Sequence, residues 1–128
     1  MREVFSLAIA GALGTLSRWA LSGWAYRLLG TRFPYGTLVV NVLGGLILGV
    51  IMEVGIASEL LPRDLRLALS VGFCGAFTTF STFSYETARY LEDGAMGIAL
   101  LNIAANVVLC LLATFTGLAA GRALLGGL

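Results

Sequence analysis

The sequence predicts an all-α membrane protein with four spanning helices in a single domain that covers residues 1–128. Of these residues, 59% are hydrophobic and 12% are charged. A soluble domain carries about 25% charged residues. Four apolar runs each approach or exceed the roughly 20 residues that cross a bilayer. The connections between these runs are short, so no room remains for a soluble domain.

The spans are expected at residues 4–29, 33–52, 67–91 and 95–121. The first contains Arg18, and its length exceeds that of a signal peptide although Arg2 precedes it. The second has no charge, and Pro34 suits its first turn, where a missing N–H costs little. The third carries Glu86 and Arg89 toward its far end. The fourth is uncharged and long enough to tilt.

The composition excludes several functional classes. The chain has no lysine and no histidine, which removes the commonest general base and the usual amine nucleophile. No phosphate-binding P-loop is present. A net charge of +1 provides no basic face for nucleic acid. Cys74 and Cys110 lie in apolar stretches without zinc-ligand spacing. We therefore expect neither an enzyme nor a nucleic-acid partner.

The arginines leave the membrane orientation open. Four spans place both termini and the 53–66 loop on one side. That side holds Arg2, Arg63, Arg66 and Arg122, and the other holds Arg27, Arg32 and Arg89. The positive-inside rule needs a clearer bias. Either one or two arginines fix a single topology, or the chain inserts both ways and forms an antiparallel two-fold dimer.

Small residues recur at a spacing of four in three predicted spans. The pairs are Gly45 and Gly49, Gly72 and Ala76, and Gly117 and Gly121. Such pairs let two helices approach closely. They can serve contacts between subunits or packing within one subunit, and the sequence does not choose between these alternatives.

The third predicted span is unusually polar. Residues 72–86 read GFCGAFTTFSTFSYE, so serine and threonine hydroxyls alternate with Phe80 and Phe83. Backbone at membrane depth must satisfy its own hydrogen bonds unless it is buried in protein or lines a polar cavity. The run therefore predicts a path or a binding site for something small and polar. The two phenylalanines share a face, either for ordinary packing or to present ring edges to an anion, whereas a cation prefers ring faces.

Polar residues in the other spans add candidates. Arg18 is a functional-site hypothesis by its depth, either attracting an anion or forming an ion pair, although its stem can also snorkel to the interface. Asn41 can donate to an anion or join two helices. Asn102, Asn106, Cys110 and Thr114 form one stripe on the fourth span. This stripe lines a pathway or holds helices together.

Three segments together resemble the Fluc/CrcB family of microbial fluoride channels. They are GALGTLSR at 11–18, FPYGTLVVNVLG at 33–44, and the run at 72–86, which is the most specific. The resemblance covers essentially the whole chain. It implies an antiparallel, dual-topology homodimer with two ion pathways in the inner or plasma membrane. It also implies passive export of fluoride, which dissociates from HF in the cytoplasm.

The resemblance also implies roles for individual residues. The pore-lining set is Asn41, Thr79, Phe80, Ser81, Thr82, Phe83, Asn102 and Asn106, and the vestibule residues are Arg18 and Glu86. The family's third helix is broken, and carbonyls at the break bind a structural sodium ion that is not transported. The matching positions are Gly75 and Thr78. Oxygen ligands suit a hard cation, and helix-break carbonyls are free to supply them.

Two other functions compete with a channel. A small multidrug transporter also has four short spans, but it needs a carboxylate deep in the membrane for proton exchange. No acid lies within the first, second or fourth predicted span, and Glu86 lies toward an end of the third. A structural subunit without transport is the remaining alternative.

Overall fold

The computed structural model describes residues 1–127 and is entirely helical in its regular structure. The elements are α1 (Arg2–Leu29), α2 (Tyr35–Ala57), α3 (Arg63–Leu67), the π-helical segment η1 (Ala68–Cys74), α4 (Gly75–Phe77), α5 (Phe80–Glu92) and α6 (Met96–Gly126). Four helical stretches are long and apolar enough to cross a membrane, and α3 through α5 together form the third. The predicted fold class of four spans is confirmed.

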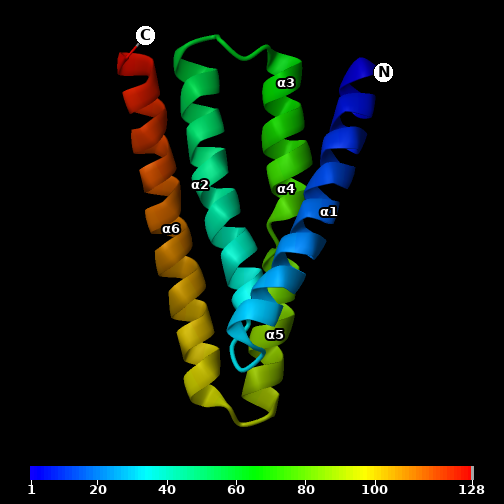
Figure 1. Cartoon of the computed structure of the whole chain (residues 1–128), viewed down its shortest axis with the longest axis vertical. Helices are drawn as coiled ribbons and strands as arrows, with labels where there is room; N and C mark the ends of the chain where they lie inside the picture. The colour runs from blue at the N-terminus through cyan, green and yellow to red at the C-terminus, as the bar shows by residue number, and fades with distance from the viewer. Residues whose placement is uncertain (128) are drawn as a thin grey trace.

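The long helices run side by side along the bundle, with both chain ends at the same end (Figure 1). The 58–62 connection also lies at that end, and the 30–34 and 93–95 connections lie at the other. Gly30 and Gly94, with φ of 89° and 74°, occupy the two turns at that other end, where a side chain would be strained. Pro34 and Pro62 immediately precede α2 and α3.

The second span is longer than its sequence pattern predicts, because α2 continues to Ala57 rather than ending near Met52. The last carbonyls of a helix lack partners within the helix. Here Arg66 Nη1 donates to the Gly55 carbonyl over 2.8 Å. Glu53 accepts from Arg122 Nε over 3.2 Å, which joins the last turns of α2 and α6. These two contacts support the extra turn.

The glycines of α2 and α6 face each other within one chain. A Cβ on Gly49 would lie 3.1 Å from the Cα of Gly117, and the reverse distance is also 3.1 Å. A Cβ on Gly121 would lie 2.7 Å from the Cβ of Glu53. A Cβ on Gly72 of η1 would likewise lie 2.9 Å from the Cβ of Ala10 on α1. Packing within the subunit therefore accounts for these glycines.

The third span is interrupted between α4 and α5. Thr78 and Thr79 have extended backbone. Thr78 has φ −86° and ψ 161°, and Thr79 has φ −149° and ψ 110°. Thr79 then caps α5, since its Oγ1 accepts from the Thr82 N–H over 3.1 Å, a favourable role for threonine. Gly44 of α2 makes room beside the break, because a Cβ there would overlap the Thr78 methyl group.

Candidate ion pathway

Two cavities lie around the break in the third span. The first, of about 450 Å³, is bounded by α2, the break, the start of α5, and α6. The second, of about 310 Å³, is bounded by α1, α2 and α5. They share no lining residue, but Asn41 lines the first, Thr79 lines the second, and the two are hydrogen-bonded. This pair therefore lies between the two cavities.

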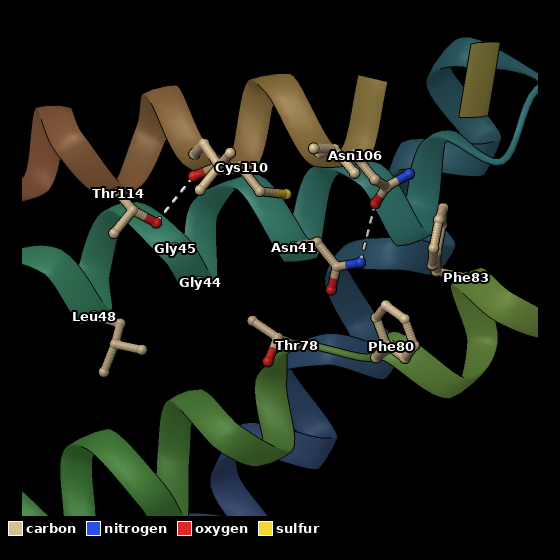
Figure 2. A pocket seen from close by; sticks show the side chains of 12 residues that line it. Asn41, Gly44, Gly45, Leu48, Thr78, Phe80, Phe83, Asn106, Cys110 and Thr114 are labelled. Atoms are coloured by element: carbon tan, nitrogen blue, oxygen red, sulfur yellow. Dashed lines mark hydrogen bonds between the residues drawn. The ribbon is translucent and has the colours of Figure 1, made fainter. Parts of the chain in front are cut away.

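The first cavity is mostly apolar, and its two asparagines lie at one end. Figure 2 shows Asn41, Asn106, Phe80 and Phe83 together at that end, and Thr114 at the other. The centroids of the Phe80 and Phe83 rings are 5.5 Å apart and the rings are tilted by 51°. Phe83 is 9% exposed, whereas Phe80 is 78% exposed and projects from the surface of the single chain.

The second cavity is polar and contains both predicted vestibule residues. Glu86 Oε1 accepts from Thr37 Oγ1 over 2.8 Å and from the Tyr26 hydroxyl over 3.2 Å. The other oxygen of Glu86 is buried and has no hydrogen-bond partner among residues 1–127. Arg18 is half-buried and lines the same cavity. It has no ion pair in the part of the chain that the structure describes, so the expected ion-pair alternative is not formed here.

Asn41 holds the backbone of the break from both sides. Its Oδ1 accepts from the Thr79 N–H over 2.7 Å, and its Nδ2 donates to the Thr79 carbonyl over 3.1 Å. The same Nδ2 donates to Asn106 Oδ1 over 3.1 Å. A side-chain amide has two N–H donors. Both donors of Asn41 are therefore used within the protein.

The bond from Asn41 continues as a chain of buried hydrogen bonds. Asn106 Nδ2 donates to Asn102 Oδ1 over 2.9 Å, and Asn102 Nδ2 donates to Thr87 Oγ1 over 3.0 Å. Thr87 donates in turn to the Phe83 carbonyl over 2.8 Å. The donors all point the same way, an arrangement in which successive bonds strengthen one another. The chain ties α2 and α6 to the first turns of α5.

The two asparagines of α6 differ in their surroundings. Asn106 is 6% exposed and lines the first cavity, whereas Asn102 is 0% exposed and lines neither cavity. Thr87, the partner of Asn102 on α5, is not among the residues expected from the sequence. Its place one turn after Phe83 is the signal that points to it, because residues four apart lie on one helix face.

The hydroxyls at the start of α5 form a cluster. Thr79 Oγ1 donates to Thr82 Oγ1 over 2.8 Å, and Ser81 Oγ lies 3.3 Å from Thr79 Oγ1. Because Thr82 accepts in the first bond, its own hydroxyl hydrogen remains available. Thr82 lines the second cavity, so this donor belongs to the polar cavity.

Two carbonyls at the break have lost their helical partners. In an α-helix the N–H of Thr79 would donate to the Gly75 carbonyl, and that of Thr82 to the Thr78 carbonyl. These N–H groups bond instead to Asn41 Oδ1 and Thr79 Oγ1. No other donor reaches either carbonyl in residues 1–127. Unpaired carbonyl oxygens fit a hard cation such as sodium.

Side-chain ligands do not provide an alternative metal centre. Residues 1–127 contain no group of three or more histidine, cysteine, aspartate and glutamate side chains placed to hold a metal. Cys74 is buried and Cys110 lines the first cavity, and neither forms a disulfide. A cation at the break would therefore depend on backbone oxygens.

The fold and these cavities define a small multi-pass membrane protein with a broken span and polar groups at membrane depth. This arrangement is typical of channels and transporters. Residues 5–118 match the family model described as CrcB-like protein, Camphor Resistance (CrcB), and the chain belongs to this family. The resemblance found in the sequence motifs is thereby confirmed.

Relatives of nearly the same length share about half of the residues. The chain is 51% identical to a fluoride-specific ion channel FluC of Pelobacter propionicus, over 99% of this chain and 98% of the relative. It is 50% identical to a fluoride-specific ion channel FluC of Citrifermentans bemidjiense, over 97% of this chain and 100% of the relative. It is 51% identical to a fluoride-specific ion channel FluC of Trichlorobacter lovleyi, over 97% of this chain and 99% of the relative. These relatives are named ion channels and not enzymes, in agreement with the expectation from composition.

Proposed function

We propose that this protein is a fluoride-selective channel that lets cytoplasmic fluoride leave the cell passively. Relatives with this named activity match the chain over almost its full length. The observation that carries the proposal is the placement of the two cavities on either side of the hydrogen-bonded Asn41–Thr79 pair, with Phe80 and Phe83 in the lining of the first. A polar cavity thus lies next to one that is lined by aromatic rings and two asparagine amides.

The physical task of such a site is to replace the water around a small, strongly hydrated anion. Arg18 raises the local anion concentration in the second cavity. The Thr82 hydroxyl offers a hydrogen there. The edges of Phe80 and Phe83 carry positive charge density. Conduction requires sites that bind the ion well enough to admit it and weakly enough to release it, and uncharged groups meet both conditions.

We assign the pathway residues different roles. Phe80, Phe83, Ser81 and Thr82 contact the ion along the pathway, with Arg18 and Glu86 at the vestibule. Asn41 and Thr79 separate the two cavities. Asn102 and Asn106, which the resemblance places along the pore, orient the Asn41 amide through the buried chain of hydrogen bonds. Asn106 also borders the first cavity.

We further propose that the working unit is an antiparallel homodimer that inserts in both orientations of the inner or plasma membrane. The 78% exposure of Phe80 supports this assembly, because a second subunit would cover the ring and enclose the open side of the first cavity. The near balance of arginines at the two ends agrees with dual insertion.

A structural sodium ion would lie where the two broken helices meet. The unpaired carbonyls of Gly75 and Thr78 would hold it, and two subunits would supply four such oxygens. The ion would neutralise the partial negative charge of carbonyls that face one another at the interface. It would not be transported.

The decisive experiment measures halide efflux from liposomes that contain the purified protein. Fluoride should leave without a gradient of protons or other ions, and chloride should stay. Proton-coupled exchange of a cationic drug would favour a multidrug transporter, and the absence of any flux would favour a structural subunit. Efflux of chloride at the fluoride rate would refute the proposed selectivity.

A further inference from the structure

Asn41 lines the first cavity and is hydrogen-bonded to Thr79, at the break whose Gly75 and Thr78 carbonyls are proposed to bind sodium. Its Oδ1 takes the Thr79 N–H over 2.7 Å. That N–H is the natural helical partner of the Gly75 carbonyl. Asn41 is thus the side chain whose bond leaves the Gly75 oxygen unpaired, although it lies on α2 and the oxygen lies on α4.

Thr79 likewise leaves the Thr78 carbonyl without its helical hydrogen bond. Its Oγ1 takes the Thr82 N–H over 3.1 Å, which leaves the Thr78 oxygen without a donor. Thr79 is in turn held by Asn41 at both its N–H and its carbonyl. One connected set of hydrogen bonds therefore unpairs both oxygens.

We propose that Asn41 is a positioning residue for the sodium ion, acting through its acceptor oxygen, in addition to its place on the fluoride pathway. The inference rests on the proposed sodium site. When Asn41 holds the Thr79 N–H, the Gly75 carbonyl is free for the cation. When the amide is removed, that N–H can return to the carbonyl and compete with sodium.

The donor and acceptor halves of the amide then have separate functions. Oδ1 serves the cation site, and Nδ2 serves the Thr79 carbonyl and the bond to Asn106. Asn41→Leu removes both halves. Asn41→Asp keeps an acceptor for the Thr79 N–H and removes both donors. Asn106→Leu leaves Asn41 intact and removes only one of its partners.

The experiment measures how sodium raises the thermal unfolding temperature of the purified assembly, with N-methylglucamine as the replacement cation. We expect half-maximal stabilisation of Asn41→Leu to require about ten-fold more sodium, the effect of one lost hydrogen bond of about 1.4 kcal/mol. Asn41→Asp and Asn106→Leu should stay within about two-fold of the unmodified protein. Thr79→Val should also weaken the sodium response.

The outcomes test the sodium site and the role of Asn41 separately. If the unmodified protein gains no stability from sodium over N-methylglucamine, the sodium site itself is wrong, and the role of Asn41 with it. If sodium stabilises the unmodified protein and Asn41→Leu equally at each concentration, only the role of Asn41 is wrong. Should Asn41→Leu not assemble, Asn41→Ala, which removes the same acceptor for the Thr79 N–H, replaces it in both comparisons.

A separate groove of about 390 Å³ lies at the end of the bundle opposite the chain termini. It is formed by the loop before α2, the first residue of α2, and the first turns of α6, and it is lined by Arg32, Phe33, Tyr35, Ile98, Leu101 and Ala105. It shares no residue with the two pathway cavities. Its walls are apolar except for the Arg32 guanidinium and the Tyr35 hydroxyl.

The position and charge of this groove fit a membrane lipid. Arg32 lies in the loop that follows α1, just beyond the end of a candidate membrane span. No hydrogen bond or ion pair engages its guanidinium within residues 1–127, whereas Arg89 at the same end pairs with Glu92. From Ile98 to Ala105 the groove descends about 10 Å along α6, at about 1.5 Å per residue. That depth suits the glycerol and the upper acyl chain of a phospholipid.

We propose that the groove binds one phospholipid with a net negative headgroup, with its phosphate at Arg32 and an acyl chain along the groove. Basic pockets between spanning helices recognise such headgroups. Tyr35 supplies an amphipathic ring at the headgroup level, as aromatic residues do at membrane interfaces.

The test counts lipids retained by the delipidated, purified assembly in native mass spectrometry, with dioleoyl phosphatidylglycerol or dioleoyl phosphatidylcholine added. Phosphatidylglycerol should bind more tightly. Arg32→Gln should weaken its binding about five-fold, the effect of one surface arginine near anionic lipid, and Arg32→Lys should restore most of it. Ala105→Phe should reduce binding of both lipids by filling the groove.

Arg27→Gln is the matched control, because it removes the same charge near the same end from a residue outside the groove. This change should alter the affinity for phosphatidylglycerol by less than about two-fold. Equal losses in Arg27→Gln and Arg32→Gln would show diffuse surface attraction, and equal binding of the two lipids would show no headgroup selection. Either result overturns the site.

Discussion

Asn41 Nδ2 donates to Asn106 Oδ1 over 3.1 Å, and this bond joins α2 to α6 at the polar end of the first cavity (Figure 2). The two residues are 65 positions apart in the sequence. Asn106 is held by Asn102, which is fully buried. The orientation of the pathway amide therefore depends on residues that lie behind it.

Asn106→Leu should slow fluoride efflux while the protein still assembles. The change removes the acceptor for Asn41 Nδ2 and leaves a buried N–H without a partner, at a cost of about 1–3 kcal/mol. Efflux from liposomes should fall roughly ten-fold, as about 1.4 kcal/mol implies. The control is Val108→Leu, an exposed position two residues on. Efflux as fast as that of the control would contradict the role assigned to Asn106.

Phe80→Ile and Phe83→Ile should each slow fluoride efflux several-fold without dissociating the assembly. Isoleucine keeps an apolar side chain but lacks the aromatic edge that we propose faces the anion. Size-exclusion chromatography of each variant checks assembly before flux is measured. The outer-face change Phe115→Ile, at another exposed phenylalanine of the single chain, is the matched control. If both pathway variants conduct at the control rate, the rings do not contact the ion.

Arg18→Gln should reduce fluoride flux most strongly at low ionic strength. The arginine lines the polar cavity without an ion pair in residues 1–127, so its field acts on the approaching anion. About a ten-fold loss is expected at roughly 10 mM salt, where screening extends over about 30 Å. The loss should shrink near 1 M salt, where the screening length is about 3 Å. A deficit that does not change with salt would indicate a structural role instead.

Gly117→Ala should destabilise the protein through the contact between α2 and α6. A Cβ at this position would overlap the Leu46 carbonyl and lie 3.1 Å from Gly49. Overpacking of this kind costs about 1–3 kcal/mol. The unfolding temperature in detergent measures the effect. Gly97→Ala is the control, because no other atom of the described residues lies within 4 Å of a Cβ there. Gly117→Ala should have a clearly lower unfolding temperature than this control.

Much of the fold follows from local sequence. Length and hydropathy place the four spans, and the family motifs at 11–18, 33–44 and 72–86 identify the family. The break agrees with threonines that favour extended backbone and cap the next helix. The end of α2 was misplaced, because the Arg66 contact with the Gly55 carbonyl that extends it comes from a different span. The assembly, the sodium site and the ion-contact roles stay predictions.

Composition and hydropathy, which are properties of local sequence, are enough to predict a four-span membrane chain with hydroxyls, phenylalanines and glycines concentrated in its third span. The packing of the helices is needed to show that Asn41 binds Thr79, that Asn102 is buried away from both cavities, and that Arg18 forms no ion pair within residues 1–127. These outcomes depend on the rotation and height of each helix relative to its neighbours. Close contacts such as that between Gly49 and Gly117 set both quantities, and hydrophobic pattern alone leaves them free.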